Sequence, residues 1–183
     1  MKSLATLLGL LLLSACSGGA GRPPRLDDSV VTFNDFESGG GWSSDPAHHN
    51  PGLVQKGRAH SGRYALRVDG NHEYSLTFAM PLGRIREAKF RKLRLEAWAF
   101  MPSERATASL GLQLLSPDYS QQLFSDDIKL RDAVHTYGQW VPIGKDVTLP
   151  DSVAPGQQLR LFMWRADATD EVLLDDVMLR ILD

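Results

Sequence analysis

From residue 29 onward, apolar and polar residues alternate along several short stretches of the chain. A period of two is typical of β-strands with one buried face, because successive side chains point to opposite faces of a sheet. The clearest case is the stretch 92–100, in which Leu93, Leu95, Ala97 and Ala99 share one face. The same pattern predicts strands over 29–36, 64–68, 73–78, 108–114, 139–149, 158–164 and 171–182.

Short runs rich in Gly, Pro, Asn and Asp separate these stretches, as turns between strands require. They lie at 39–41, 50–52, 69–71, 101–103 and 154–156. Helical periodicity is scarce, and only 82–93 has room for a helical turn. About eight to ten short strands with turns between them predict an all-β fold. We expect a two-sheet antiparallel β-sandwich of the jelly-roll type, formed as a single domain by residues 30–183.

The composition narrows the classes of function. The chain has 183 residues, of which 43% are hydrophobic and 23% charged, as in ordinary globular proteins. Lys and Arg total 20 against 22 for Asp and Glu, and the net charge of −2 argues against a nucleic-acid partner. A single cysteine excludes a disulfide framework and a cysteine-based zinc site. We find no nucleophile elbow, phosphate-binding glycine loop or zinc-protease helix, and we expect no enzyme activity and no catalytic residues.

The N-terminus has the features of a secretory signal. Lys2 is followed by an uncharged apolar run over 4–13, which is far shorter than the roughly 20 residues of a membrane-spanning helix. The sequence Leu-Ser-Ala-Cys at 13–16 resembles the lipobox of bacterial lipoproteins. That resemblance implies a signal peptide over 1–15, lipidation of Cys16, and anchoring in a membrane of the bacterial cell envelope. Residues 16–29, rich in Gly and Pro, are predicted to be a flexible tether. Ser17 resembles an outer-membrane sorting residue.

Several spaced features of residues 30–183 resemble the galactose-binding-like β-sandwich that includes many non-catalytic carbohydrate-binding modules. In chain order they are Phe36-Glu37, Trp42, the Gly-Arg-Ala-His-Ser-Gly sequence at 57–62, Leu66-Arg67-Val68, Trp98, Trp140, Leu149-Pro150 and Asp175-Asp176-Val177. The resemblance implies a domain that binds a glycan without catalysis. It also implies a structural calcium ion that ties the first strand to the last.

Carried over to this chain, the calcium ligands would be the carboxylate of Glu37, a carboxylate of Asp175 or Asp176, and backbone oxygens around His60 and Ser61. Calcium prefers six to eight hard oxygen ligands in a flexible cage. Asp175 is an odd-numbered residue of the predicted strand, as are the apolar residues Leu173, Val177, Leu179 and Ile181. It should therefore point inward with them, where an unpaired carboxylate is unfavourable. The alternative is an Asp175 at the rim that is hydrogen-bonded to turn amides or paired with Arg.

A sugar site needs flat aromatic faces with polar groups beside them. The set that we predict is Arg94, Trp98, Gln113 and Tyr119. The four Trp occupy framework-like positions, and we expect most of them in the core. Tyr74 follows a turn and is a surface candidate. Gln113 shares a face with Ser109 and Gly111, and Trp164 shares one with Arg160, so these residues are also candidates for the ligand face.

Two further features bear on partners. Six cations fall within 84–94, at Arg84, Arg86, Lys89, Arg91, Lys92 and Arg94. They suit an anionic glycan or phosphate, or else a solvated loop. The leading hypothesis is therefore a lipid-anchored glycan-binding protein of the envelope. The alternative is a structural, protein-interaction or adhesion module with an envelope protein as its partner, which a flat apolar patch would favour.

Overall fold

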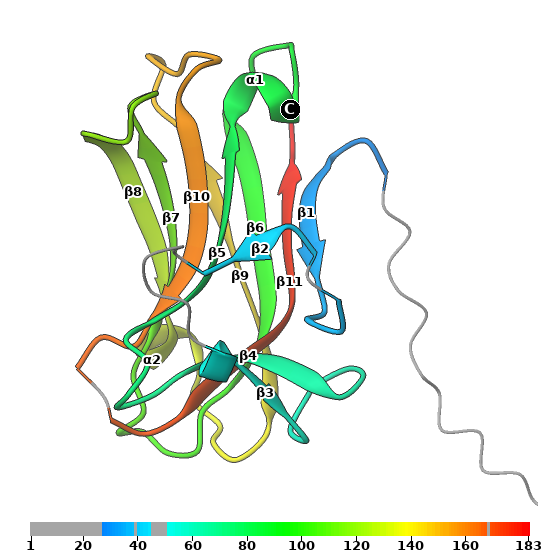
Figure 1. The fold of residues 1–183 in the computed structure, drawn as a ribbon, viewed down its shortest axis with the longest axis vertical. Helices are drawn as coiled ribbons and strands as arrows, with labels where there is room; N and C mark the ends of the chain where they lie inside the picture. Colours follow the sequence, from blue (N-terminus) through cyan, green and yellow to red (C-terminus); the bar gives the residue numbers. More distant parts are fainter. Residues whose placement is uncertain (1–26, 39, 45–50, 168) are drawn as a thin grey trace, which may run out of the picture.

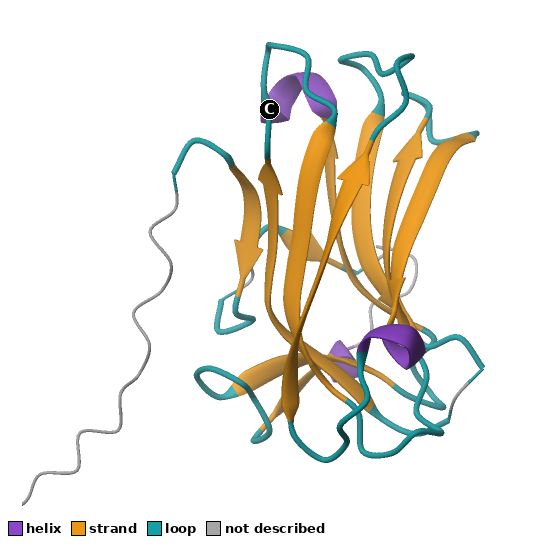
Figure 2. Cartoon of the chain, turned by 180° about the vertical axis from the view of Figure 1, so that it is seen from behind, coloured by secondary structure: helices purple, strands orange, loops and turns teal. Residues whose placement is uncertain are grey.

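The structure is a computed structural model that describes residues 27–183 except 39, 45–50 and 168. The predicted signal peptide, Cys16 and nearly all of the predicted tether lie outside the described residues. Two antiparallel sheets face one another in the described part of the chain, and this confirms the predicted β-sandwich (Figures 1 and 2).

Sheet A contains both the first and the last of the described strands. Its order is β3 (Val54–Lys56), β4 (Tyr64–Val68), β11 (Val172–Ile181), β6 (Lys92–Phe100) and β9 (Trp140–Thr148). Strand β1 (Val30–Asn34) also pairs with β11, beyond the part of β11 that pairs with β4. Strand β11 is therefore the centre of this sheet, with β6 along one side and β4 and then β1 along the other.

Sheet B packs against sheet A and contains the other five described strands. Its order is β2 (Trp42–Ser43), β5 (Tyr74–Pro81), β10 (Gln158–Trp164), β7 (Ser109–Leu115) and β8 (Gln122–Lys129). The inward side chains of both sheets form one apolar core, which includes Leu95 of sheet A and Leu112 and Leu161 of sheet B. Burial of this apolar surface is the main favourable contribution to the stability of the fold.

Helical structure is confined to three short segments in the described part of the chain. They are the 3₁₀ turn η2 (Pro51–Leu53) and the helices α1 (Leu82–Ile85) and α2 (Leu130–Ala133). Helix α1 is the single turn that the sequence allowed within 82–93. None of the helices among the described residues is long and apolar enough to cross a membrane.

Most predicted strands lie within a residue or two of their expected bounds, but alternation missed β2, β3 and β8. Strand β8 lies at the open edge of sheet B and most of its side chains reach solvent. Its sequence, Gln-Leu-Phe-Ser-Asp-Asp-Ile-Lys, therefore shows little apolar alternation. Strands β2 and β3 have two and three residues, too few for a period to appear.

A bulge in β11 changes which face its residues occupy. The pairing of β11 with β6 shifts between Asp175 and Met178. Before the bulge, Leu174 belongs to the main core, whereas Leu173 packs with Ala65 and Phe100 in a separate cluster. After it, odd-numbered residues such as Val177 and Leu179 face the core. Asp175 is fully buried, as predicted, but its cross-strand partner is Trp98, so it lies on the outward face of sheet A.

Candidate functional site

The outward face of sheet B carries a row of polar and aromatic side chains. In β10, Leu159, Leu161 and Met163 are buried, and the alternate residues Arg160, Phe162 and Trp164 therefore face outward. Across the sheet, Phe162 is paired with Thr77 of β5 and Gly111 of β7. Strand pairing thus brings residues from distant parts of the sequence onto one surface.

Two adjoining hollows lie on this face. The larger has a volume of about 690 Å³, and its lining includes Tyr74, Thr77 and Arg160. The smaller has a volume of about 330 Å³, and its lining includes Gly111, Asp127 and Trp164. Gln113 and Phe162 line both. We call the continuous depression formed by these eight residues the sheet-B groove.

The sheet-B groove presents aromatic surface to solvent. Tyr74 is 54% exposed and Trp164 is 38% exposed. The rings of Tyr74 and Phe162 lie 6.0 Å apart between centroids. A Cβ on Gly111 would lie 3.5 Å from the ring of Phe162, so the glycine leaves space above the sheet beside that ring. Exposed aromatic faces beside polar groups are what a pyranose ring needs for stacking and hydroxyl contacts.

Polar groups flank these rings. The Gln113 side chain donates a hydrogen bond to the Gln122 side-chain oxygen at 2.9 Å. At the β8 side, Lys145 pairs with Asp126 at 2.5 Å, and Asp127 contributes another carboxylate to the lining. The guanidinium of Arg160 lies 5.6 Å from the ring centroid of Phe162. The groove therefore offers donors and acceptors beside its aromatic rings.

The four residues predicted as one ligand set do not come together. Gln113 lies in the sheet-B groove. Arg94 and Trp98 lie on β6 of sheet A, because alternation alone does not show which sheet a strand joins. Tyr119 lies in the turn between β7 and β8, where its hydroxyl donates to Gln158 at 3.1 Å. The prediction of a single face that holds all four is wrong; a ligand role for each residue stays a prediction.

The tryptophans differ from expectation. Trp42 is in the main core, but Trp98 and Trp140 are only partly buried, on the outward face of sheet A, and Trp164 is exposed. Trp164 and Arg160 are both even-numbered residues of β10, and this alternation did indicate that they share one face. Phe162, which lies between them with the same parity, was missed because a phenylalanine in a strand is usually part of the core.

A second cluster ties the loop after β3 to the bulge in β11. Asp175 accepts hydrogen bonds from the backbone N–H groups of His60 (2.8 Å), Ser61 (3.0 Å) and Asp176 (2.8 Å). Asp176 contacts the His60 ring nitrogen at 2.6 Å and accepts from the Ser61 hydroxyl at 2.7 Å. The His60 ring stacks on Trp98 with centroids 3.7 Å apart. These contacts hold the loop against sheet A.

Glu37 anchors the following residues of the same loop. Its carboxylate accepts from the backbone N–H groups of Arg63 (2.5 Å) and Tyr64 (2.7 Å). The hydrogen bond from Arg63 is the largest influence on the pKa of Glu37 and lowers it below its usual value. Gly62 adopts a positive φ of 61°, and any side chain there would collide with the Glu37 carboxylate. Both the positive φ and the lack of space for a Cβ therefore require glycine at position 62.

These contacts also test the fit of a calcium ion. Burial raises the pKa of Asp175 to about 7, and the Ser61 amide offsets part of that effect. Backbone N–H groups, rather than carbonyl oxygens, face the carboxylates of Asp175 and Glu37. Among the described residues, no group of three or more His, Cys, Asp or Glu has a metal-binding arrangement. The described geometry thus matches the turn-amide alternative more closely than a calcium cage, and calcium binding stays a prediction.

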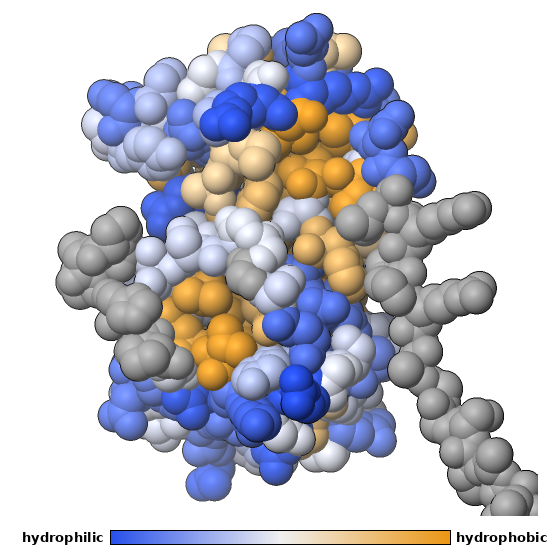
Figure 3. All heavy atoms as spheres, turned by 45° about the vertical axis from the view of Figure 1, so that its right-hand side comes forward, coloured by the Kyte–Doolittle hydropathy of each residue, from blue (hydrophilic) through white to orange (hydrophobic). Residues whose placement is uncertain are grey.

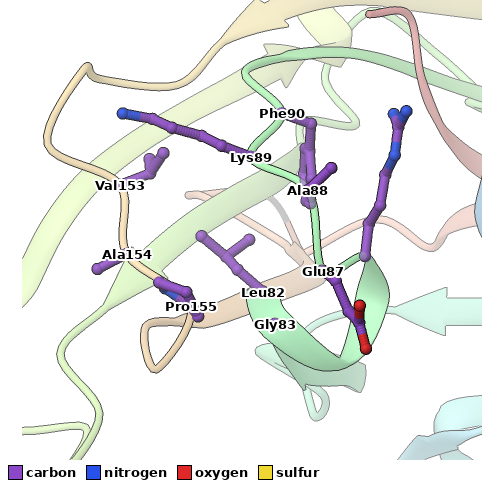
Figure 4. A pocket seen from close by; sticks show the side chains of 10 residues that line it. Leu82, Gly83, Glu87, Ala88, Lys89, Phe90, Val153, Ala154 and Pro155 are labelled. Carbon is purple, nitrogen blue, oxygen red and sulfur yellow. The ribbon is translucent and has the colours of Figure 1, made fainter.

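A smaller hollow of about 80 Å³ lies beside α1 at one end of the sandwich (Figure 4). Its lining is mainly apolar and includes Leu82, Phe90 and Pro155. Several of the cations predicted as an anion-binding cluster lie at this end, but they have protein partners. Arg91 pairs with Asp151, and Lys89 donates to the Asp151 carbonyl at 2.6 Å. These two cations are therefore already engaged by protein groups.

Solved structures of carbohydrate-binding modules share this fold. The chain aligns with the CBM22-1–GH10 modules of endo-1,4-β-D-xylanase 10B from Clostridium thermocellum, solved with xylohexaose, with a TM-score of 0.58 and 14% identity. That alignment covers 86% of this chain and 29% of the xylanase chain. The CBM22-1 xylan-binding domain of Xyn10C from Paenibacillus barcinonensis aligns with a TM-score of 0.52 and 18% identity, over 84% of this chain and 95% of that chain.

A further xylan-binding domain of carbohydrate-binding module family 22 aligns with a TM-score of 0.54 and 16% identity, over 85% of this chain and 97% of that one. No family model matches the sequence, and no curated protein matches it. At these identities the likeness is one of fold. The chain has the β-sandwich fold that is found in carbohydrate-binding modules of family 22.

Proposed function

We propose that this chain is a non-catalytic carbohydrate-binding module, anchored by lipid in the bacterial cell envelope, whose ligand lies in the sheet-B groove. The observation that carries the proposal is the row of outward aromatic side chains, Tyr74, Phe162 and Trp164, beside Gln113 and Arg160 in one continuous depression. The shared fold with xylan-binding modules supports it. Stacking would hold the sugar rings, and the polar groups would select among hydroxyl arrangements.

The glycan proposal is tested on an array of neutral and acidic oligosaccharides with the purified full-length chain in detergent. We expect reproducible binding. Phe162→Ala and Trp164→Ala should each weaken it about tenfold or more, as for aromatic anchors in other interfaces. Trp98→Ala, on the other sheet, should leave it unchanged. If Trp98→Ala abolishes binding and Trp164→Ala does not, the ligand face is sheet A. A blank array would contradict glycan binding.

The lipid anchor rests on the sequence at 13–16. A cysteine with several acyl chains exceeds what stable anchoring needs, because each buried methylene contributes about 0.8 kcal/mol. We expect Cys16→Ala to move the protein from the membrane fraction to the soluble fraction of bacterial cells. Ser14→Ala, which leaves the cysteine in place, is the matched control and should remain in the membrane fraction. Retention of Cys16→Ala in the membrane would reject the anchor.

The alternative is a protein-interaction or adhesion module. On the side of the molecule in Figure 3, apolar surface falls in two areas with polar residues between them. A divided apolar surface is less suited to a flat protein interface than a continuous one. Together with the aromatic groove on sheet B, this divided surface supports a glycan ligand over a protein partner.

A further inference from the structure

Arg160 has an unusual setting among the outward residues of sheet B. Its neighbours across the two adjacent strands are Ala79 of β5 and Gln113 of β7, and both are uncharged. Two positions along the same strand, Phe162 lies beneath its guanidinium. The side chain is half-buried and lines the larger hollow of the groove. A fixed positive charge thus lies within the aromatic part of the groove.

Among the described residues, no carboxylate lies within 4 Å of Arg160, the distance of an ion pair. Outward arginines of sheet A differ in this respect. Arg94 pairs with Asp146 at 2.9 Å, Arg180 pairs with Glu96 at 3.2 Å, and Arg67 pairs with Asp69 at 3.4 Å. These three outward arginines of sheet A are therefore paired with carboxylates, whereas Arg160 in the groove is available to a ligand.

The chemistry of the guanidinium indicates what it would bind. Arginine presents a planar fork of N–H donors that fits the two oxygens of a carboxylate. Contact of the guanidinium with an aromatic ring is favourable and leaves the edge of the fork open to a ligand. In a groove already suited to sugar rings, the matching group is the carboxylate of a uronic acid.

The acidic residues of the groove would set the orientation of such a ligand. Asp127 lines the smaller hollow without an ion-pair partner among the described residues, and would repel a second carboxylate there. Glu73 lines the larger hollow but is exposed to water, where its charge is screened. A ligand carboxylate is therefore favoured beside Arg160, with a neutral sugar beside Trp164.

We infer that the sheet-B groove prefers acidic glycans, with Arg160 binding the carboxylate of a uronic acid residue in the larger hollow. This inference rests on the proposed function. It adds a charge preference to that function, carried by the position of Arg160 in the groove.

The test compares oligosaccharides that differ only in a C6 carboxylate, such as oligomers of glucose and glucuronic acid, galactose and galacturonic acid, and mannose and mannuronic acid. With the full-length chain, at least one acidic oligomer should bind about tenfold more tightly than its neutral counterpart. Arg160→Gln should remove that difference, so that each acidic oligomer binds no more tightly than its neutral counterpart. Arg160→Lys should retain part of it. Arg131→Gln changes the net charge equally at an exposed position outside the groove and should retain all of it.

The outcomes separate the two proposals. Equal binding of both members of every pair, with no effect of Arg160→Gln, would overturn the acidic preference and leave glycan binding in place. The inference would also be overturned if Arg131→Gln lowered the acidic preference as much as Arg160→Gln. The preference would then follow the net charge of the protein and not the position of Arg160. If no oligosaccharide on a broader array binds, the proposed function fails and this inference fails with it.

Discussion

Replacement of Asp175 by Ala should lower the free energy of unfolding by about 3 kcal/mol, the largest stability effect that we expect from a single polar residue here. The carboxylate is fully buried and accepts three backbone N–H hydrogen bonds. Its removal leaves those donors without their acceptor, and each buried unsatisfied group costs about 1–3 kcal/mol. Relief of the buried charge offsets part of this, since burial already raises the pKa of Asp175. Urea unfolding of the full chain, followed by tryptophan fluorescence, measures the change.

Asp176→Asn is the matched control for this experiment. Asp176 is the adjacent residue and has a positive φ of 48°, a conformation that Asn tolerates well. Its side chain is partly exposed, and we expect a loss of about 1 kcal/mol or less. If Asp175→Ala stays within 0.5 kcal/mol of the wild type, the carboxylate does not organise the loop.

The same unfolding curves test the calcium prediction. A ligand that binds only the folded state raises its stability by mass action. If Glu37 and Asp175 hold calcium, added calcium should raise the wild-type midpoint, excess chelator should lower it, and Asp175→Ala should respond to neither. A wild-type midpoint that is unchanged under both conditions would reject calcium at this site.

Gly111→Phe should reduce glycan affinity by about thirtyfold or more while the sandwich remains folded. Gly111 lies on the outward face of β7 between Phe162 and Asp127, and its hydrogen points into the smaller hollow. A phenyl ring there would occupy the space of a sugar and cover the Phe162 ring. Such a loss corresponds to about 2 kcal/mol, the size of a central contact in an interface. Titration of the full chain with an oligosaccharide that binds on the array measures it.

Gly111→Ala separates obstruction from backbone effects. Its Cβ would be in ordinary contact, 3.5 Å from the Phe162 ring, and Gly111 does not adopt a positive φ. We therefore expect Gly111→Ala to bind within about twofold of the wild type and to be as stable or more stable. Full affinity in Gly111→Phe, with a normal unfolding curve, would place the ligand elsewhere.

Sequence alternation predicted the architecture well because it reports which face of a strand is buried. Strands β6 and β10 share the bounds predicted for them, since both are central and their inward residues are all apolar. The order of strands in the sheets is a different property. Gln113 and Trp98 show the same alternation, yet they lie on different sheets, and only long-range pairing decides this.

The bulge in β11 is a second feature that sequence alternation could not predict. Parity wrongly placed Asp175 on the inward face of the sheet. An extra residue between Asp175 and Met178 reverses the faces within the strand, so Asp175 is buried on the outward face. The sequence Asp-Asp-Val does not reveal the bulge. Phe162 was missed for a related reason: its place on the outward face follows from its position in β10, whereas its residue type suggests the core.

The central place of β11 in sheet A has a consequence for the timing of folding. Strand β11 pairs with β4, β6 and β1, so this sheet cannot close before residue 181 has left the ribosome. Synthesis proceeds at about 5–20 residues per second, and the earlier strands must wait for their shared partner. For a precursor with the proposed secretion signal, that delay is useful. If the proposed signal directs export, sheet A would stay incomplete while the N-terminus is engaged and would close only after the chain has crossed the membrane.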